Sequence, residues 1–228
     1  MDQKLPIIQP KRRPARKRLS REEKAQRTRD SIMAAAYNVV ASDGYANAAI
    51  ARIASEAGVA QGTFYNYFED RQDLFDQLLP YQGLRMREVI EHEARKVSAG
   101  MERELVRFAA FLDYVAENDG FYRVLYEAEI FSPDAHAAHI GNIVRGYRRS
   151  FQRGMEQGWL QNLDDRQLEC LIYQILGIRA YAAMQIHNAG SDAEKQAIRD
   201  VSVDVYAMML RCGMAGEKTE EVQNPSTG

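Results

Sequence analysis

Residues 48–68 read AAIARIASEAGVAQGTFYNYF, and this stretch decides the fold. From Ile50 to Ala57, apolar residues recur at positions i, i+3, i+4 and i+7, which gives one apolar face of a helix. Gly58 follows at once, and glycine in this position can end a helix in a left-handed conformation. A second short helix over about 61–67 then completes a helix-turn-helix, two helices joined by a glycine-containing turn.

The second helix of this motif carries side chains that can contact DNA. Gln61, Thr63, Tyr65 and Asn66 offer hydrogen-bond donors and acceptors to base edges or phosphates when such a helix lies in the major groove. The helix has almost no net charge, so attraction to phosphates must come from other parts of the chain. The motif therefore predicts a DNA-reading helix.

The same residues resemble the TetR family of bacterial transcriptional repressors. The resemblance covers about residues 28–79 and rests on the run AGVAQGTFYNYF at 57–68, followed by an acidic residue, a basic residue and Leu74. It implies an all-α protein with an N-terminal three-helix DNA-binding domain and a C-terminal helical domain for ligand binding and dimerisation. The C-terminal two thirds of the chain match the family only in length and helicity.

The resemblance also implies a set of DNA-contacting residues. In the family, a threonine often caps the second helix and contacts phosphate, but here Ala48 and Ala49 stand at that position. Asn47 is the nearest side chain able to cap this helix. Arg71 replaces the usual lysine and keeps its charge. We expect DNA contacts from Thr28, Arg29, Asn47, Gln61, Gly62, Thr63, Tyr65, Asn66, Tyr67 and Arg71.

Charge is distributed unevenly along the chain. Residues 1–30 hold eleven basic and four acidic side chains, a net charge of +7, whereas the whole chain carries −2, so the remainder carries −9. A basic end on an acidic body suits DNA binding at one end only. Residues 1–19 mix prolines with basic side chains, which argues against a packed structure. This segment is either an arm that follows phosphates or the minor groove, or a solvated tail.

The rest of the sequence predicts a series of helices and divides the chain into four segments. Ser20 and Glu23 form a capping-box pattern that begins a first helix, ending near Ser42. Later helices are expected over 70–97, 100–117, 121–131, 139–157, 164–188 and 191–212. Pro80 predicts a bend that is either a hinge or a simple kink. The segments are a disordered basic arm at 1–19, a DNA-binding domain at 20–69, an effector-binding and dimerisation domain at 70–214 and a disordered tail at 215–228.

Composition excludes several classes of protein. The chain has 228 residues, of which 46% are hydrophobic and 27% charged, and no apolar run approaches the ~18 residues of a membrane helix. Cys170 and Cys212 are far apart and form no CxxC motif. We therefore expect a reduced, cytoplasmic protein with two buried thiols and no disulfide.

No catalytic or cofactor motif is present in the sequence. GxSxG, Walker A and GxGxxG patterns are absent, so we expect neither an enzyme nor a cofactor. His136 and His139 lie three residues apart, a spacing that metal ligands on one helical face also show. No cysteine or second histidine pair lies nearby in sequence, which favours a loop or helix-start role for both.

Aromatic residues are abundant in the C-terminal region. Buried tyrosines need partners for their hydroxyl groups, and several together can line an effector cavity that also orients its ligand. The family resemblance implies a ligand site in this region, and the residue types favour an apolar or amphipathic organic molecule, including one with an acyl chain. The expected lining is Phe108, Phe111, Tyr114, Tyr122, Tyr126, Tyr147 and Tyr173.

The helix expected at 164–188 is apolar around most of its circumference. Such a helix needs two burial partners, its own domain and a second subunit. Together with the last helix, it gives a predicted dimer interface of Leu168, Leu171, Ile175, Ile178, Val201, Val205 and Met208. Arg179 lies within this apolar helix. Three roles are open for Arg179: pairing with an acid in the core, bridging the subunits, or holding an anionic ligand. We favour the first.

These patterns predict a homodimeric repressor that binds a palindromic double-stranded DNA operator and is released by a small effector. The mechanism would be a population shift toward a conformer that fits DNA poorly. The alternative is an all-helical enzyme or ligand carrier in which the helix-turn-helix is incidental.

Overall fold

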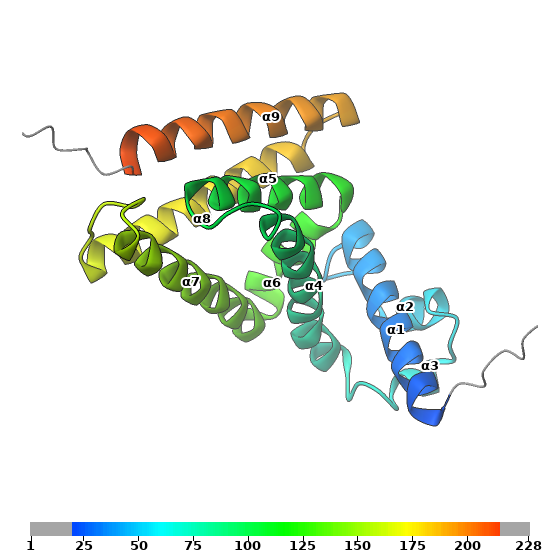
Figure 1. The fold of residues 1–228 in the computed structure, drawn as a ribbon. Coiled ribbons are helices and arrows are strands. Elements are labelled where there is room, and N and C mark those ends of the chain that lie inside the picture. The colour runs from blue at the N-terminus through cyan, green and yellow to red at the C-terminus, as the bar shows by residue number, and fades with distance from the viewer. Residues whose placement is uncertain (1–19, 215–228) are drawn as a thin grey trace, which may run out of the picture.

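The computed structural model describes residues 20–214, and every regular element in that range is helical. Figure 1 shows α1 to α3 at one end of the molecule, with α4 between them and the helices of the C-terminal body. The predicted arm at 1–19 and tail at 215–228 lie outside the described residues. The helices are α1 (Arg21–Asp43), α2 (Ile50–Glu56), α3 (Gln61–Phe64), α4 (Arg71–Ala94), α5 (Met101–Glu117), α6 (Phe121–Phe131), α7 (Pro133–Glu156), α8 (Asp165–His187) and α9 (Asp192–Met209). A π-helical turn, Leu210–Met214, follows α9. The predicted all-α fold class is confirmed.

The first helix begins where the capping-box pattern predicts. The Ser20 hydroxyl accepts a hydrogen bond from the Glu23 backbone N–H at 3.0 Å, and the Glu23 carboxylate accepts one from the Ser20 N–H at 2.7 Å. These reciprocal bonds satisfy two donors that the helix itself leaves unpaired. Ile32, Met33, Ala35, Ala36, Val39 and Val40 are buried, and they anchor α1 to the rest of the core.

The helix-turn-helix forms as predicted, with two differences in detail. Gly58 has a φ of 70°, so it adopts the left-handed conformation that ends α2. The regular part of α3 stops at Phe64, earlier than expected. Asn47, the nearest side chain able to cap α2, does not cap it. Its side-chain amide donates to the carbonyl of Asp43 at 3.0 Å, at the end of α1, and α2 begins after Ala49 with no side-chain cap.

Helix α4 connects the two ends of the molecule. Asp70 caps its start, accepting a hydrogen bond from the backbone N–H of Asp73 at 2.8 Å. The helix contains Pro80 and packs against α1, α5, α6 and α7. It ends at Ala94, slightly before the predicted Val97. Because one helix touches both the DNA-binding end and the body, a change in the body can reach α1.

Helix α7 begins six residues earlier than predicted. The Ser132–Pro133 pair was expected to end α6, and it also starts the next helix, because proline at the first helical position needs no N–H donor and has a suitable fixed φ. The prediction of a start at His139 is therefore wrong. Helix α8 begins with a capping box formed by Asp164 and Gln167.

Helix α6 joins the body to the end of α1. The Arg123 guanidinium donates to two carbonyls at the C-terminal end of α1, at 2.7 and 3.0 Å. Gly120 packs on Ala41 so closely that a Cβ at Gly120 would overlap the Cβ of Ala41. Beyond the end of α1, the ring of Tyr45 stacks on Phe131 with centroids 5.8 Å apart.

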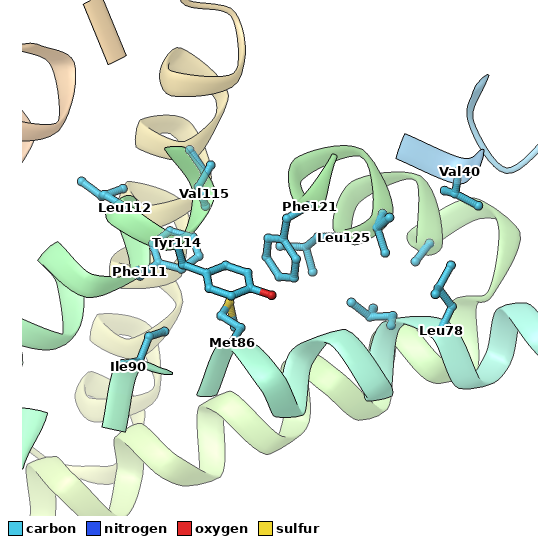
Figure 2. Packing of buried hydrophobic residues seen from close by; sticks show 14 of the residues in the cluster. Val40, Leu78, Met86, Ile90, Phe111, Leu112, Tyr114, Val115, Phe121 and Leu125 are labelled. Atoms are coloured by element: carbon cyan, nitrogen blue, oxygen red, sulfur yellow. The ribbon is translucent and has the colours of Figure 1, made fainter. Parts of the chain in front are cut away.

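The buried apolar residues form one cluster that runs through both parts of the molecule. Figure 2 shows Val40 of α1 and Leu78 of α4 on one side of the view. Ile90 of α4 and Phe111 of α5 lie on the other side of the same view. The DNA-binding end and the body therefore share a continuous core.

The structure bears on two expectations from composition, the burial of the cysteines and the lack of a membrane helix. Cys170 and Cys212 were expected to be buried, and this is wrong, because both are exposed. The tendency of cysteine to be buried is only a propensity, and each of these residues falls on an outward-facing position of its helix. Within residues 20–214, no helix is long and apolar enough to cross a membrane.

Candidate nucleic-acid interface and effector region

The surface of α3 and the turn after it carries exposed polar side chains. Gln61, Tyr65 and Asn66 are exposed, and Tyr65 retains half of its accessible surface. Phe64 and Phe68 are buried beneath them and hold this segment on the domain. The predicted reading side chains are therefore presented outward from an apolar anchor, whereas the predicted residues Thr63 and Tyr67 are half-buried.

Gly62 is notable because the fold does not require it. Its φ lies outside the left-handed region, and a Cβ built there would meet nothing within 4 Å. Within the chain, alanine would fit and would favour the helix. A glycine with no internal reason fits a position where another molecule approaches the backbone closely.

The flanking residues that were expected to contact DNA all make contacts within the chain. The Thr28 hydroxyl donates to the Lys24 carbonyl at 3.0 Å. Arg29 donates to the Gln77 side chain and lies 5.5 Å from the ring centroid of Phe68. These contacts hold α1 against α4 and the end of the helix-turn-helix.

Arg71 is also held within the chain. It donates to the carbonyls of Tyr45 and Ala46 at 3.0 and 3.3 Å and covers the ring of Phe75. Together with Arg29, it supports the turn and the helices around α3, whatever further contact either side chain makes with DNA.

Three basic side chains missed by the sequence prediction lie on the first turns of α1. Arg21, Lys24 and Arg27 are exposed, and none forms an ion pair with another described residue. Their spacing of three residues places them near one another along one side of the helix. This spacing was visible in the sequence and is the signal that the prediction overlooked. They supply positive charge that α3 lacks.

The predicted dimer residues fall into two groups. Leu168 and Ile175 are buried within their own subunit, and Leu171 and Ile178 are half-buried. By contrast, the members on α9 are exposed: Val201 by 63%, Val205 by 45% and Met208 by 58%.

Two tyrosines on α8, the helix that packs against α9, are also exposed. Tyr173, which was expected in the effector lining, is 51% exposed, and Tyr181 is 67% exposed. Between them lies Gly177, where a Cβ would meet nothing within 4 Å. The three residues recur every four positions along α8, and α8 packs against α9. We call Tyr173, Tyr181, Val201, Val205 and Met208 the α8–α9 face.

A polar centre lies within the otherwise apolar body, and we define it as Glu104, Tyr147, Arg179 and Tyr206. Glu104 is 2% exposed, and its Oε1 accepts hydrogen bonds from the hydroxyls of Tyr147 at 2.9 Å and Tyr206 at 3.2 Å. Burial raises the pKa of Glu104, an effect that the nearby Arg179 charge opposes. The sequence prediction missed Glu104, although it lies on the same helical face as Phe108.

Arg179 lies beside this carboxylate but forms no ion pair with it. Its Nη2 donates to the carbonyl of Arg107 at 3.1 Å, and the guanidinium covers the rings of Phe111 and Tyr147. The Nε of Arg179 and the Oε2 of Glu104 are both buried with no hydrogen-bond partner among the described residues. A buried donor and a buried acceptor are therefore available at the polar centre.

The other aromatic residues expected in the effector lining are distributed over the body. Phe108 contacts Tyr206 with ring centroids 4.2 Å apart, next to the polar centre. Tyr122 lies between Tyr126 and the ring of His187, at 4.4 and 4.7 Å. Tyr114 instead contacts Phe121 and faces toward α4 and α1.

His139 on α7 has a packing role. His139 is buried, and its ring lies where a Cβ on Gly83 would come within 2.6 Å. Burial lowers the pKa of His139 to about 4, so the ring is neutral near pH 7. Among residues 20–214, no group of three or more histidine, cysteine or acidic side chains is arranged to hold a metal ion.

Comparison with known proteins agrees with this architecture. Residues 32–78 match the family described as bacterial regulatory proteins, tetR family. An HTH-type transcriptional regulator of Haemophilus influenzae is 25% identical over 101 residues, which cover 44% of this chain and 49% of that protein. The match thus spans about half the length of that curated relative.

Solved structures extend the likeness to the body. A TetR-family transcriptional regulator from Syntrophomonas wolfei has a TM-score of 0.69 and 19% identity, covering 82% of this chain and 96% of that one. FadR from Bacillus subtilis, solved with stearoyl-CoA, has a TM-score of 0.64 and 19% identity, covering 76% and 97%. These likenesses establish the fold.

The fold and the exposed motif define a helix-turn-helix DNA-binding protein with an appended helical body. Residues 32–78 match the DNA-binding domain of the tetR family, and the described chain has the fold of solved TetR-family regulators. The resemblance found in the sequence is confirmed.

Proposed function

We propose that the protein is a transcriptional repressor that binds a palindromic operator as a two-fold homodimer and is released by a small apolar or amphipathic effector. The observation that carries the proposal is the α3 surface, where Gln61, Tyr65 and Asn66 project from a buried anchor beside the open position at Gly62. A short helix with this exposure fits the major groove, and Arg21, Lys24 and Arg27 add charge for phosphates.

The α8–α9 face supports dimerisation. Large apolar side chains gathered on two packed helices are costly to leave in water and favour association. Pairing two copies about a two-fold axis buries this face in a four-helix bundle. The same axis relates the two α3 helices, so the operator is palindromic, with half-sites about one helical turn apart or slightly more.

The polar centre supports an amphipathic effector. Around it, Phe108, Phe111 and the neighbouring side chains are apolar and suit a hydrocarbon or an aromatic group. Arg179 Nε and Glu104 Oε2 offer one donor and one acceptor to the polar end of such a molecule. The similar FadR of Bacillus subtilis was solved with stearoyl-CoA, and this favours an effector with an acyl chain.

The route from effector to DNA runs through α4 and α6. Both helices contact α1 and the body, and Arg123 and Gly120 bring α6 directly onto the end of α1. An effector that prefers one arrangement of these helices shifts the population of DNA-binding conformers by its difference in affinity.

Selection of bound DNA tests the regulator against the alternative of an enzyme or ligand carrier. Genomic fragments retained by the protein are identified and then titrated at several salt concentrations. We expect a palindromic site whose log K falls linearly with log salt. Binding that is weak and equal on all fragments, together with turnover or tight carriage of a metabolite, would favour the alternative.

A further inference from the structure

A cavity of about 440 Å³ lies where the DNA-binding end meets the body, apart from both the α3 surface and the polar centre. It is bounded by α1, α4 and α5. Tyr37 and Asn38 come from α1, Gln82 and Arg85 from α4, and Tyr114 from α5. The volume falls within the range of small-molecule sites. A molecule held here would touch helices of both domains at once.

The amide and phenol groups around this cavity are largely free for a ligand. Gln82 is only 4% exposed, yet its side-chain amide makes no hydrogen bond with any residue between 20 and 214. The Asn38 amide and the Tyr114 hydroxyl likewise have no hydrogen-bond partner in that range. Tyr37 donates to the Asn118 carbonyl over a long 3.4 Å. None of these atoms is among the fully buried unpaired polar atoms of the described residues, so they reach solvent and are available to a polar ligand in the cavity.

Two charged side chains at the cavity also have no ion-pair partner among residues 20–214. Arg85 forms no ion pair within the described range, and its guanidinium lies 6.0 Å from the ring centroid of Tyr81. Burial raises the pKa of Tyr37 to about 12 and also raises the pKa of Tyr114, and the Arg85 charge opposes both rises. Both phenols are therefore neutral near pH 7. Glu88, one turn further along α4, also lacks an ion-pair partner in this part of the chain.

We propose that this cavity binds a small aromatic carboxylate with a hydroxyl substituent, as a second regulatory site between the DNA-binding domain and the body. Arg85 supplies charge-assisted hydrogen bonds to the carboxylate. The rings of Tyr37 and Tyr114 enclose the aromatic ring, and the side-chain carbonyl of Gln82 accepts the hydrogen bond that the hydroxyl donates. Because the ligand joins α1 to α4 and α5, it fixes the orientation of the DNA-binding domain; this regulatory part rests on the proposed function, and the binding does not.

Isothermal titration of the full-length protein with 4-hydroxybenzoate tests the binding. We expect saturable binding that weakens at least about tenfold in Arg85→Gln and for the uncharged analogue 4-hydroxybenzamide. Arg87→Gln is the matched control, because it removes the same charge from an exposed position on α4 outside the cavity. Val89→Trp should fill the cavity and abolish binding.

The outcomes separate this site from the effector region. No saturation at millimolar concentrations, or equal affinity in Arg85→Gln and Arg87→Gln, overturns the proposal. Loss of binding in Glu104→Gln with retention in Arg85→Gln would move the ligand to the polar centre and also overturn it. Melting curves of each variant establish that it is folded. Since titration needs no DNA, failure to bind 4-hydroxybenzoate is distinguishable from failure of the repressor proposal.

Discussion

Glu127 of α6 accepts a hydrogen bond from the backbone N–H of Tyr45, at 2.9 Å, immediately after the end of α1. The same carboxylate also pairs with Arg123 at 3.4 Å and packs on Gly44, whose φ is 79°. One side chain of the body therefore holds the turn that precedes the helix-turn-helix.

Removing this carboxylate should loosen the junction. Glu127→Ala leaves the Tyr45 N–H without its acceptor, so we expect a loss of about 1–3 kcal/mol in the free energy of unfolding. Urea titration followed by circular dichroism measures this loss. Glu129→Ala, exposed on the same helix, is the control. Equal midpoints for the two variants would contradict the role given to Glu127.

Specific DNA binding should depend on the exposed side chains of α3. We expect Gln61→Ala and Tyr65→Ala each to weaken operator binding by about 1–3 kcal/mol per lost contact, with less effect on non-specific DNA. Gel-shift titrations on operator and on random DNA measure both. Gln152→Ala, exposed on α7, should bind as the unmodified protein does. If both α3 variants behave like this control, another element reads the operator.

Gly62 gives a sharper test, because stability and DNA binding should move in opposite directions. Gly62→Ala is expected to raise the free energy of unfolding by up to about 1 kcal/mol while weakening operator binding. Gly146 of α7 is a matched helical glycine with the same open surroundings. Gly146→Ala should stabilise the protein and leave DNA affinity unchanged. Unaltered operator affinity in Gly62→Ala would argue against a close backbone approach.

Dimerisation should depend on the exposed part of the α8–α9 face. Val201→Glu places a charge where association would bury it without a partner, so we expect a folded monomer of 26.0 kDa in light scattering. Ile130→Glu is the control, because Ile130 is 77% exposed on α6. A monomeric unmodified protein at micromolar concentration, or a dimeric Val201→Glu variant, would refute this interface.

The polar centre should make stability depend on pH. Burial raises the folded-state pKa of Glu104 above its ordinary 4.5, so the folded protein holds that proton more tightly than the unfolded chain. The resulting stabilisation is present below pH 4.5 and is lost as the pH rises through the folded pKa. Glu104→Gln has no such proton, so its stability relative to the unmodified protein should increase with pH above 4.5. Urea titrations at several pH values measure this, with the exposed Glu102→Gln as control; parallel curves for the two variants would exclude it.

Local chemistry explains which parts of the fold were predictable. Gly58 and the Ser20 cap act through neighbouring residues, so their sequence patterns were sufficient. The start of α7 was missed because Ser132–Pro133 both ends one helix and begins the next.

Features that depend on tertiary packing could not be predicted from sequence patterns alone. Helix α8 is apolar on more than one side, and periodicity alone does not say that Ile175 faces its own core while Tyr181 faces outward. The polar centre joins Glu104 to Tyr206 across 102 positions in the chain, and no local pattern connects them. The lining predicted for the effector drew on aromatic content, and aromatic side chains also fill ordinary cores.

The contact between Gly120 and Ala41 has a mechanical consequence. At this contact backbone meets a single methyl group, which has no rotamer that could change and absorb a displacement, while Arg123 bridges the same two helices nearby. We therefore expect a movement of the start of α6 toward α1 to displace the end of α1 directly. Helix α1 would then act as a lever that moves α3.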